Sequence, residues 1–203
     1  SAAASAAASG AAAATGEPIT IGMPIAQSGP AGIADDKDCW TGAILAQDYP
    51  SDRMELIVVD GMSDDASYEH LSDLAKRDPR LRVLRNPRRI VPSSLNLAIG
   101  EARGEVIVRV DAHTEIAPNY VRVGAEILAR TGADNVGGPM VKIGGGAVGD
   151  AIAGAMSSRF GIGSYFQFGT AEREADTVYM GMWPRRVFEK VGLFDEELVR
   201  NQD

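Results

Sequence analysis

The feature that most constrains the fold is a near-continuous apolar run, MELIVVD, from Met54 to Asp60. A strand in which almost every residue is apolar is suited to burial on both faces, as in a parallel sheet covered by helices. A second run, EVIVRVD from Glu105 to Asp111, has the same form and also ends in an aspartate. Both aspartates are therefore expected at the carboxyl ends of strands.

Strand and helix patterns alternate along the chain. Further strands are predicted at Ile19–Pro24, Leu81–Leu84, Asn135–Ile143 and Thr177–Trp183. Helices are predicted at Ala34–Asp48, Ser67–Arg77, Ser93–Ala102, Pro118–Thr131, Val148–Arg159 and Arg185–Val191. This alternation predicts an α/β fold, Rossmann-like, with a mostly parallel sheet and helices on both faces. Such sheets bind ligands beyond the carboxyl ends of their strands.

Composition narrows the class of protein. With 203 residues, 45% of them hydrophobic, the chain can bury the core of one domain. The net charge of -8 provides no basic field, so no nucleic-acid partner is expected. The single cysteine, Cys39, excludes an internal disulfide and fits a reducing compartment. No run of about 18 uncharged apolar residues is present, so no membrane-spanning helix is expected.

Two segments have biased composition. Residues 1–16 are rich in alanine and serine and have little to bury, so they are expected to be a low-complexity linker or tag, followed by one domain over residues 17–203. Residues 144–169 are rich in glycine and suit a loop that closes over a ligand, although an irregular surface connection explains them equally well.

Asp111 and His113 stand one residue apart, directly after the second apolar run. A carboxylate and an imidazole at a sheet edge are suited to a divalent cation that holds phosphate groups. The alternative is that Asp111 caps a turn and His113 is an ordinary surface histidine. The motifs elsewhere in the chain favour the metal site.

These motifs are MELIVVDGMSDDAS, SSLNLAIGEARGEVIVRVDAHTEI and TVYMGMWPRRVFEKVGLFDEEL followed by RNQD. Over residues 54–203 they resemble family 2 glycosyltransferases of the GT-A fold, in particular bacterial enzymes that build exopolysaccharides such as succinoglycan. Each motif alone is weak, but the ordered set is specific. The resemblance implies an inverting transferase that moves a sugar from a nucleotide-diphosphate donor, expected to be a UDP-sugar. The acceptor would be a hydroxyl of a glycan or lipid-linked molecule in cell-surface polysaccharide synthesis.

The resemblance also implies a donor site. Asp60 would contact the uracil or ribose, and Asn96 lies in the segment that runs behind the nucleotide. Arg88 would pair with the diphosphate, although a solvated basic turn explains it equally well. Asp111 and His113 stand where the family usually carries Asp-x-Asp, so they would hold Mn²⁺ or Mg²⁺, and the imidazole favours Mn²⁺. The cation would neutralise charge on the leaving nucleoside diphosphate.

On the acceptor side, Asp203 occupies the position of the family's carboxylate base, which would take the proton from the acceptor hydroxyl. The alternative is that Asp203 is only a frayed terminal residue. Trp183 would stack on an acceptor sugar, or it belongs to the core. The segment Phe194–Glu196 is interpreted as support by packing and capping.

Several polar residues have a simpler structural interpretation. Asp64 and Asp65 precede a predicted helix and are expected to cap it. Ser93 or Ser94 would cap the next helix in the same way.

Two observations keep other functions open. The segment after the first strand lacks the Asn-Glu turn usual in the family, and the sequence stops at Asp203, where relatives continue. A non-catalytic nucleotide-sugar-binding or assembly module of the same fold, truncated at its C-terminus, is therefore the alternative function. A dinucleotide-dependent oxidoreductase is a weaker one, because Gly29–Gly32 lacks the G-x-G-x-x-G spacing. The expected location is the cytoplasm or the inner face of the plasma membrane, with membrane association only through regions beyond this chain.

Overall fold

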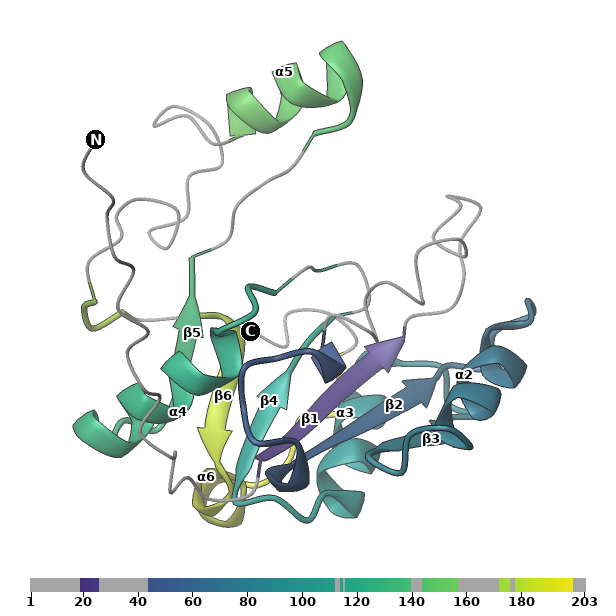
Figure 1. Ribbon diagram of the computed structural model, residues 1–203, viewed down its shortest axis with the longest axis horizontal. Coiled ribbons are helices and arrows are strands. Elements are labelled where there is room, and N and C mark those ends of the chain that lie inside the picture. The colour runs from purple at the N-terminus through teal and green to yellow at the C-terminus, as the bar shows by residue number, and fades with distance from the viewer. Residues whose placement is uncertain are drawn as a thin grey trace, which may run out of the picture.

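The computed structural model describes residues 19–25, 44–111, 114, 116–139, 144–156, 172–175 and 178–198 (Figure 1). Its strands are β1 (Ile19–Ile25), β2 (Met54–Asp60), β3 (Leu81–Arg85), β4 (Val106–Arg109), β5 (Val136–Gly138) and β6 (Tyr179–Pro184). Its helices are α2 (Ser67–Ala75), α3 (Val91–Glu101), α4 (Tyr120–Thr131), α5 (Gly146–Met156) and α6 (Arg185–Val191), with a short 3-10 helix, η2, at Ser51–Arg53.

The described strands form one sheet in the order β3-β2-β1-β4-β6-β5. β1 pairs in parallel with β2 and β4, and β2 pairs in parallel with β3. β6 runs antiparallel to both β4 and β5. The predicted mostly parallel sheet is therefore confirmed, with an antiparallel part at one side. The strand order reverses between β1 and β4, and this reversal is the topological switch point of the sheet.

Burial on both faces explains why β2 is almost entirely apolar. Leu56 and Val58 belong to the main core cluster, which also contains residues of α2 and α4. Ile57 and Val59 point to the opposite face, where they pack with Ala98 of α3. Because successive side chains of a strand alternate between faces, only a continuous apolar run satisfies both layers. The prediction of helices on both faces is confirmed.

The start of α3 differs from the prediction. The helix begins at Val91 with Ile90 as its N-cap residue, and Pro92 occupies the first turn, where a missing N–H costs nothing. Ser93 and Ser94 lie inside the helix, so the prediction that one of them caps it is wrong. Both hydroxyls instead bond to a buried asparagine described below.

The other predicted cap is confirmed for Asp65. The N–H of Ser67, the first residue of α2, donates to Asp65 Oδ1 at 2.9 Å, which satisfies one of the free donors at the helix start. The N-cap residue itself is Ala66, so Asp65 acts from one position further out. Asp64 is exposed.

β5 is shorter than predicted. It ends at Gly138, and Pro139 follows, which has no N–H to donate to a neighbouring strand. The remaining predicted strand residues 140–143 lie outside the described residues. Of the helix predicted at residues 34–48, the structure describes only the end, in which Ile44 and Leu45 are helical.

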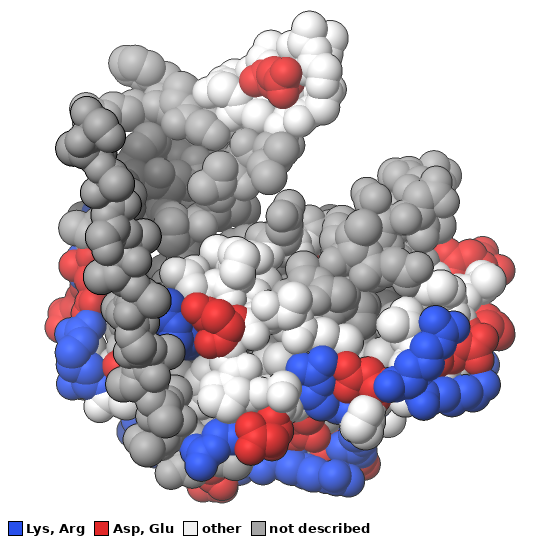
Figure 2. Space-filling view, in the orientation of Figure 1, with Lys and Arg blue, Asp and Glu red and all other residues white. Residues whose placement is uncertain are grey.

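α5 stands away from the sheet in Figure 1. It contains one charged residue, Asp150, and Val148 and Ile152 are exposed on it. Figure 2 shows this helix as a largely uncharged projection, whereas positive and negative side chains are interspersed over the described surface around the sheet. Within the described ranges, none of the helices has the length and apolar character needed to cross a membrane.

We predict that Leu56→Ala lowers the free energy of unfolding by about 2–5 kcal/mol, because Leu56 is fully buried in the central sheet and its removal leaves a cavity. Urea denaturation followed by circular dichroism measures this change. Leu97→Ala is the matched control. Leu97 lies on the exposed side of α3, so a change below about 0.5 kcal/mol is expected. Equal effects of the two substitutions would contradict the described core.

Candidate functional site

Two aspartates lie at the carboxyl edge of the sheet, on either side of β1. Asp60 is the last residue of β2 and is in register with Ile25 of β1. Asp111 follows β4 by two residues, and Arg109 at the end of β4 is in register with Gly22 of β1. Two interstrand steps separate β2 from β4, about 10 Å. The pair therefore flanks the switch point, where open α/β sheets bind their ligands.

The Asp60 side chain is completely buried. Its two carboxylate oxygens accept the backbone N–H of Ser63 at 3.1 and 3.3 Å. Arg85, the last residue of β3, approaches Asp60 Oδ2 with its Nε at 3.6 Å. The same guanidinium lies 4.4 Å from the centre of the Tyr68 ring, a cation–π contact. Asp60 is thus balanced by a neighbouring positive charge.

Ser63 carries an unusual buried hydroxyl. Within the described part of the chain, its Oγ is the one buried side-chain oxygen or nitrogen atom without a hydrogen-bond partner. Met62, directly before it, has a φ of 64°, in the left-handed region that a non-glycine residue rarely occupies. A buried polar group without a partner costs about 1–3 kcal/mol of stability, so a ligand that bonds to this hydroxyl would remove that cost.

Arg109 holds the carboxylate of Asp111. Its Nε donates to Asp111 Oδ1 at 2.9 Å, and a terminal nitrogen donates to Oδ2 at 3.1 Å. Arg109 is almost completely buried, so the fork is shielded from solvent. The two residues are two positions apart and their side chains lie on the same side of the extended chain. Sequence reasoning missed Arg109, although a charged residue inside an otherwise apolar strand was the signal available.

β6 braces the segment after β4. The N–H of Asp111 lies 3.2 Å from the sulfur of Met180, and the hydroxyls of Thr114 and Tyr179 are 2.8 Å apart. The Tyr120 hydroxyl donates to the carbonyl oxygen of Met180. Burial raises the pKa of Tyr120, so this hydroxyl keeps its proton. Asp111 is therefore anchored both by its side chain and by its backbone.

His113 and Asp203 lie outside the described residues, and their predicted roles stay predictions. Among the residues that are described, there is no group of three metal-capable side chains. Asp111 alone still fits a metal site of the phosphate-bridging kind, because such cations are held by one or two carboxylates together with substrate phosphates. Each of its oxygens also keeps a lone pair beyond the one that Arg109 uses.

Arg88 and Asn96 meet at Glu196. A terminal nitrogen of Arg88 donates to Glu196 Oε2. The side-chain nitrogen of Asn96 donates to Glu196 Oε1 at 3.1 Å and to the carbonyl oxygen of Phe194 at 2.8 Å. The structure thus brings these two predicted site residues together, because both contact residues 194–196. Their nucleotide-binding roles stay predictions.

Asn86 organises the turn between β3 and α3. Its side chain is buried, donates to Ser94 Oγ at 2.9 Å and to the carbonyl of Ile90 at 3.1 Å, and accepts from Ser93 Oγ at 3.2 Å. This is where the two predicted cap serines are used. The same side-chain oxygen accepts the N–H of Arg88 at 3.0 Å, which fixes the backbone at that arginine.

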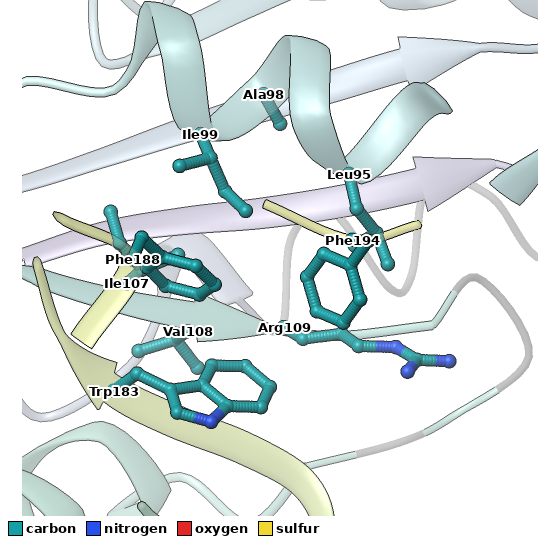
Figure 3. Close-up of a pocket in the computed structure, with 9 residues that line it drawn as sticks. All are labelled: Leu95, Ala98, Ile99, Ile107, Val108, Arg109, Trp183, Phe188 and Phe194. Carbon is teal, nitrogen blue, oxygen red and sulfur yellow. The ribbon is translucent and has the colours of Figure 1, made fainter. Parts of the chain in front are cut away.

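Trp183 belongs to an aromatic cluster under α3 (Figure 3). Its ring meets those of Phe188 and Phe194 edge to face, with centroids 5.8 and 6.3 Å away. The three rings line a cavity of about 10 Å³ together with side chains of α3 and β4, which has room for one water molecule at most. This packing agrees with the core interpretation of Trp183, and it confirms the packing role of Phe194. Stacking of Trp183 on an acceptor sugar stays a prediction.

The arrangement of strands and edge carboxylates defines a GT-A fold, and solved structures agree. Mannosyltransferase PcManGT from Pyrobaculum calidifontis, solved with GDP-Man and Mn²⁺, has a TM-score of 0.64 and 20% identity to this chain, covering 90% of it and 48% of that protein. S. aureus TarS 1-349 in complex with UDP-GlcNAc has a TM-score of 0.54 and 18% identity, covering 64% of this chain and 36% of that one. At these identities the likeness shows the fold.

Sequence comparison identifies the family. The family described as glycosyl transferase family 2 matches residues 41–192, and the chain belongs to this family. Succinoglycan biosynthesis protein ExoA of Rhizobium meliloti (strain 1021) is 32% identical over 151 residues, which are 73% of this chain and 46% of that protein. A dolichyl N-acetyl-alpha-D-glucosaminyl phosphate 3-beta-D-2,3-diacetamido-2,3-dideoxy-beta-D-glucuronosyltransferase of Methanococcus voltae is 24% identical over 165 residues, 77% of this chain and 51% of that protein. The chain thus spans about half the length of these relatives. The predicted family and fold are confirmed.

We predict that Arg109→Ala lowers the free energy of unfolding by about 3 kcal/mol, because it leaves the shielded Asp111 carboxylate without its counter-charge. Chemical denaturation at neutral pH measures the loss. Arg186→Ala is the control, since Arg186 also pairs with an aspartate, Asp134, but both side chains are more than half exposed. The control should change stability by less than about 1 kcal/mol. A loss at Arg109 no larger than at Arg186 would refute the structural importance of the fork.

Proposed function

We propose that this domain transfers a sugar, with inversion, from a UDP-sugar to a hydroxyl of a glycan or lipid-linked acceptor in cell-surface polysaccharide synthesis. The observation that carries the proposal is the position of Asp60 and Asp111, which lie at or just beyond the ends of the two strands that flank β1 at the switch point. Membership of glycosyltransferase family 2 supports the reaction class. The relative named as a succinoglycan biosynthesis protein supports the polysaccharide pathway.

The nucleoside of the donor binds at the end of β2. The Asp60 carboxylate accepts a hydrogen bond from a base N–H or a ribose hydroxyl. The Ser63 hydroxyl, which has no partner within the described residues, gains one from the same ligand. Arg85, whose side chain is 42% exposed, lies 3.6 Å from the buried Asp60 carboxylate, so its displacement would open that carboxylate to the nucleoside.

The diphosphate binds beside Asp111. A divalent cation, Mn²⁺ or Mg²⁺, would be held by Asp111 and His113 and would supply charge neutralisation for the leaving nucleoside diphosphate. Arg109 keeps the Asp111 carboxylate in one orientation before the donor arrives. The GDP-Man and Mn²⁺ present in the PcManGT structure support a metal in this proposal.

The acceptor hydroxyl approaches from the opposite side of the anomeric carbon. Asp203 takes its proton as the hydroxyl oxygen forms the new bond and the bond to the nucleoside diphosphate breaks. A single displacement of this kind inverts the anomeric configuration.

We predict that UDP binds in the presence of Mn²⁺ and that Asp111→Asn weakens this binding at least about 10-fold, because the amide is a poorer metal ligand. Titration calorimetry with and without Mn²⁺ measures the affinity. Asp134→Asn is the control, because Asp134 is exposed and lies before β5 at the opposite edge of the sheet. A folded wild-type protein that binds neither UDP nor GDP with Mn²⁺ would remove the proposal. Binding without any transfer would favour the non-catalytic module.

Ser63→Ala tests the nucleoside position through two measurements, the stability of the free protein and its affinity for UDP. Without a ligand, removal of the unpartnered hydroxyl should leave the free energy of unfolding unchanged or raise it by up to about 1 kcal/mol. The affinity for UDP should fall about 3- to 10-fold, because the ligand loses a hydrogen bond. Thermal denaturation and calorimetry measure the two effects, with the exposed Ser51→Ala as control. Unchanged UDP affinity would place the nucleoside elsewhere.

A further inference from the structure

We propose that Asn96 is a positioning residue, whose side-chain amide fixes residues 194–196 against α3 and thereby places the segment that leads to the acceptor side of the reaction. The inference rests on the proposed function, because the base proposed there, Asp203, follows residues 194–196 along the chain. It gives Asn96 a different task from nucleotide binding.

The contact between Asn96 and Phe194 is reciprocal. The side-chain nitrogen of Asn96 donates to the carbonyl oxygen of Phe194 at 2.8 Å, and the N–H of Phe194 donates to Asn96 Oδ1 at 2.9 Å. A side-chain amide here pairs with both polar groups of one backbone residue, as a neighbouring strand would. Because hydrogen bonds are directional, two of them fix both the position and the orientation of the segment, whereas a single bond would leave it free to rotate.

Glu196 adds a second connection to the same amide. The second hydrogen on the Asn96 nitrogen is directed to Glu196 Oε1 at 3.1 Å, so both donors of the amide are used. The other carboxylate oxygen of Glu196 accepts from Arg88. The glutamate side chain is 27% exposed, so its charge is balanced while it is partly withdrawn from water.

The connection continues to the donor side. Arg88 is held by Asn86, whose own N–H donates to the carbonyl oxygen of Asp60 at 2.7 Å. A chain of hydrogen bonds therefore runs from the end of β2, through Asn86 and Arg88, to Glu196. The aromatic contact between Phe194 and Trp183 holds the segment from below. Residues 194–196 thus have a fixed place relative to Asp60 at the end of β2.

The test is Asn96→Ala, with Asn119→Ala as the matched control. Asn119 is exposed at the start of α4 and its side chain makes no capping bond. Hydrogen exchange of the Phe194 amide, measured by NMR, should become at least about 10-fold faster in Asn96→Ala, while amides of β2 keep their protection. UDP affinity with Mn²⁺ should stay within about 3-fold of the wild type. Transferase activity is measured as UDP release from UDP-glucose, UDP-galactose or UDP-N-acetylglucosamine, with octyl glucoside as acceptor. In Asn96→Ala the kcat of this reaction should fall, while the KM for the donor should stay unchanged.

A second variant keeps the test decisive if the alanine variant is unstable. Asn96→Asp retains an oxygen for the Phe194 N–H but loses both donors and faces Glu196 with a like charge. It should therefore accelerate exchange of the segment, and adding Glu196→Gln should restore protection, since glutamine donates to the new carboxylate. Glu189→Gln, at an exposed position of α6, is the control for that second substitution.

The outcomes separate this inference from the proposed function. Unchanged exchange at Phe194 in both Asn96 variants overturns the positioning role, and so does a loss of UDP affinity of 10-fold or more, which would make Asn96 a ligand. Faster exchange with unchanged kcat overturns the link to the reaction. A wild-type protein that binds no nucleotide overturns the proposed function, while the exchange data still decide whether the amide fixes the segment.

Discussion

Burial of the parallel strands on both faces governs where this domain can carry chemistry. β2 has helices above and below it, so a charged side chain near its middle would have no access to water on either face. Its one glutamate, Glu55, lies at the second position and pairs with Arg82. Polar groups are accommodated where the strands end. Because β1, β2, β3 and β4 run in the same direction, their carboxyl ends meet at one edge, and Asp60 and Asp111 lie together there for this reason.

Three carboxylates in the part of this region that the structure describes have an arginine beside them. Arg85 approaches Asp60, Arg109 forks onto Asp111, and Arg88 binds Glu196. A carboxylate withdrawn from water is expensive without a counter-charge, so these pairs allow acidic groups to stay buried before any ligand is present. The three arginine side chains differ in their exposure to solvent, and Arg109, which pairs with Asp111, is the least exposed of them. The carboxylates of Asp60 and Asp111 are therefore held in place by contacts within the described residues.

Local patterns in the sequence predicted the parts of the fold that depend on local periodicity. The bounds of β2 and α6 agree with prediction, and the aspartates at strand ends follow from where the apolar runs stop. Contacts between distant residues left no local signal. Asn96 and Phe194 are separated by 98 positions, so nothing near either residue indicates that they pair.

Ser93 and Ser94 show the same limit at short range. A serine before a helical pattern is a good N-cap, and propensity alone places the cap there. The helix starts earlier because Asn86 is buried under its first turn and both hydroxyls satisfy that amide. Asn86 and Asn96 are suited to such positions because an amide both donates and accepts and carries no charge. It can replace a backbone partner without the desolvation cost of an ion, so these two uncharged amides lie at the junctions between elements, while the least exposed carboxylates, those of Asp60 and Asp111, have an arginine beside them.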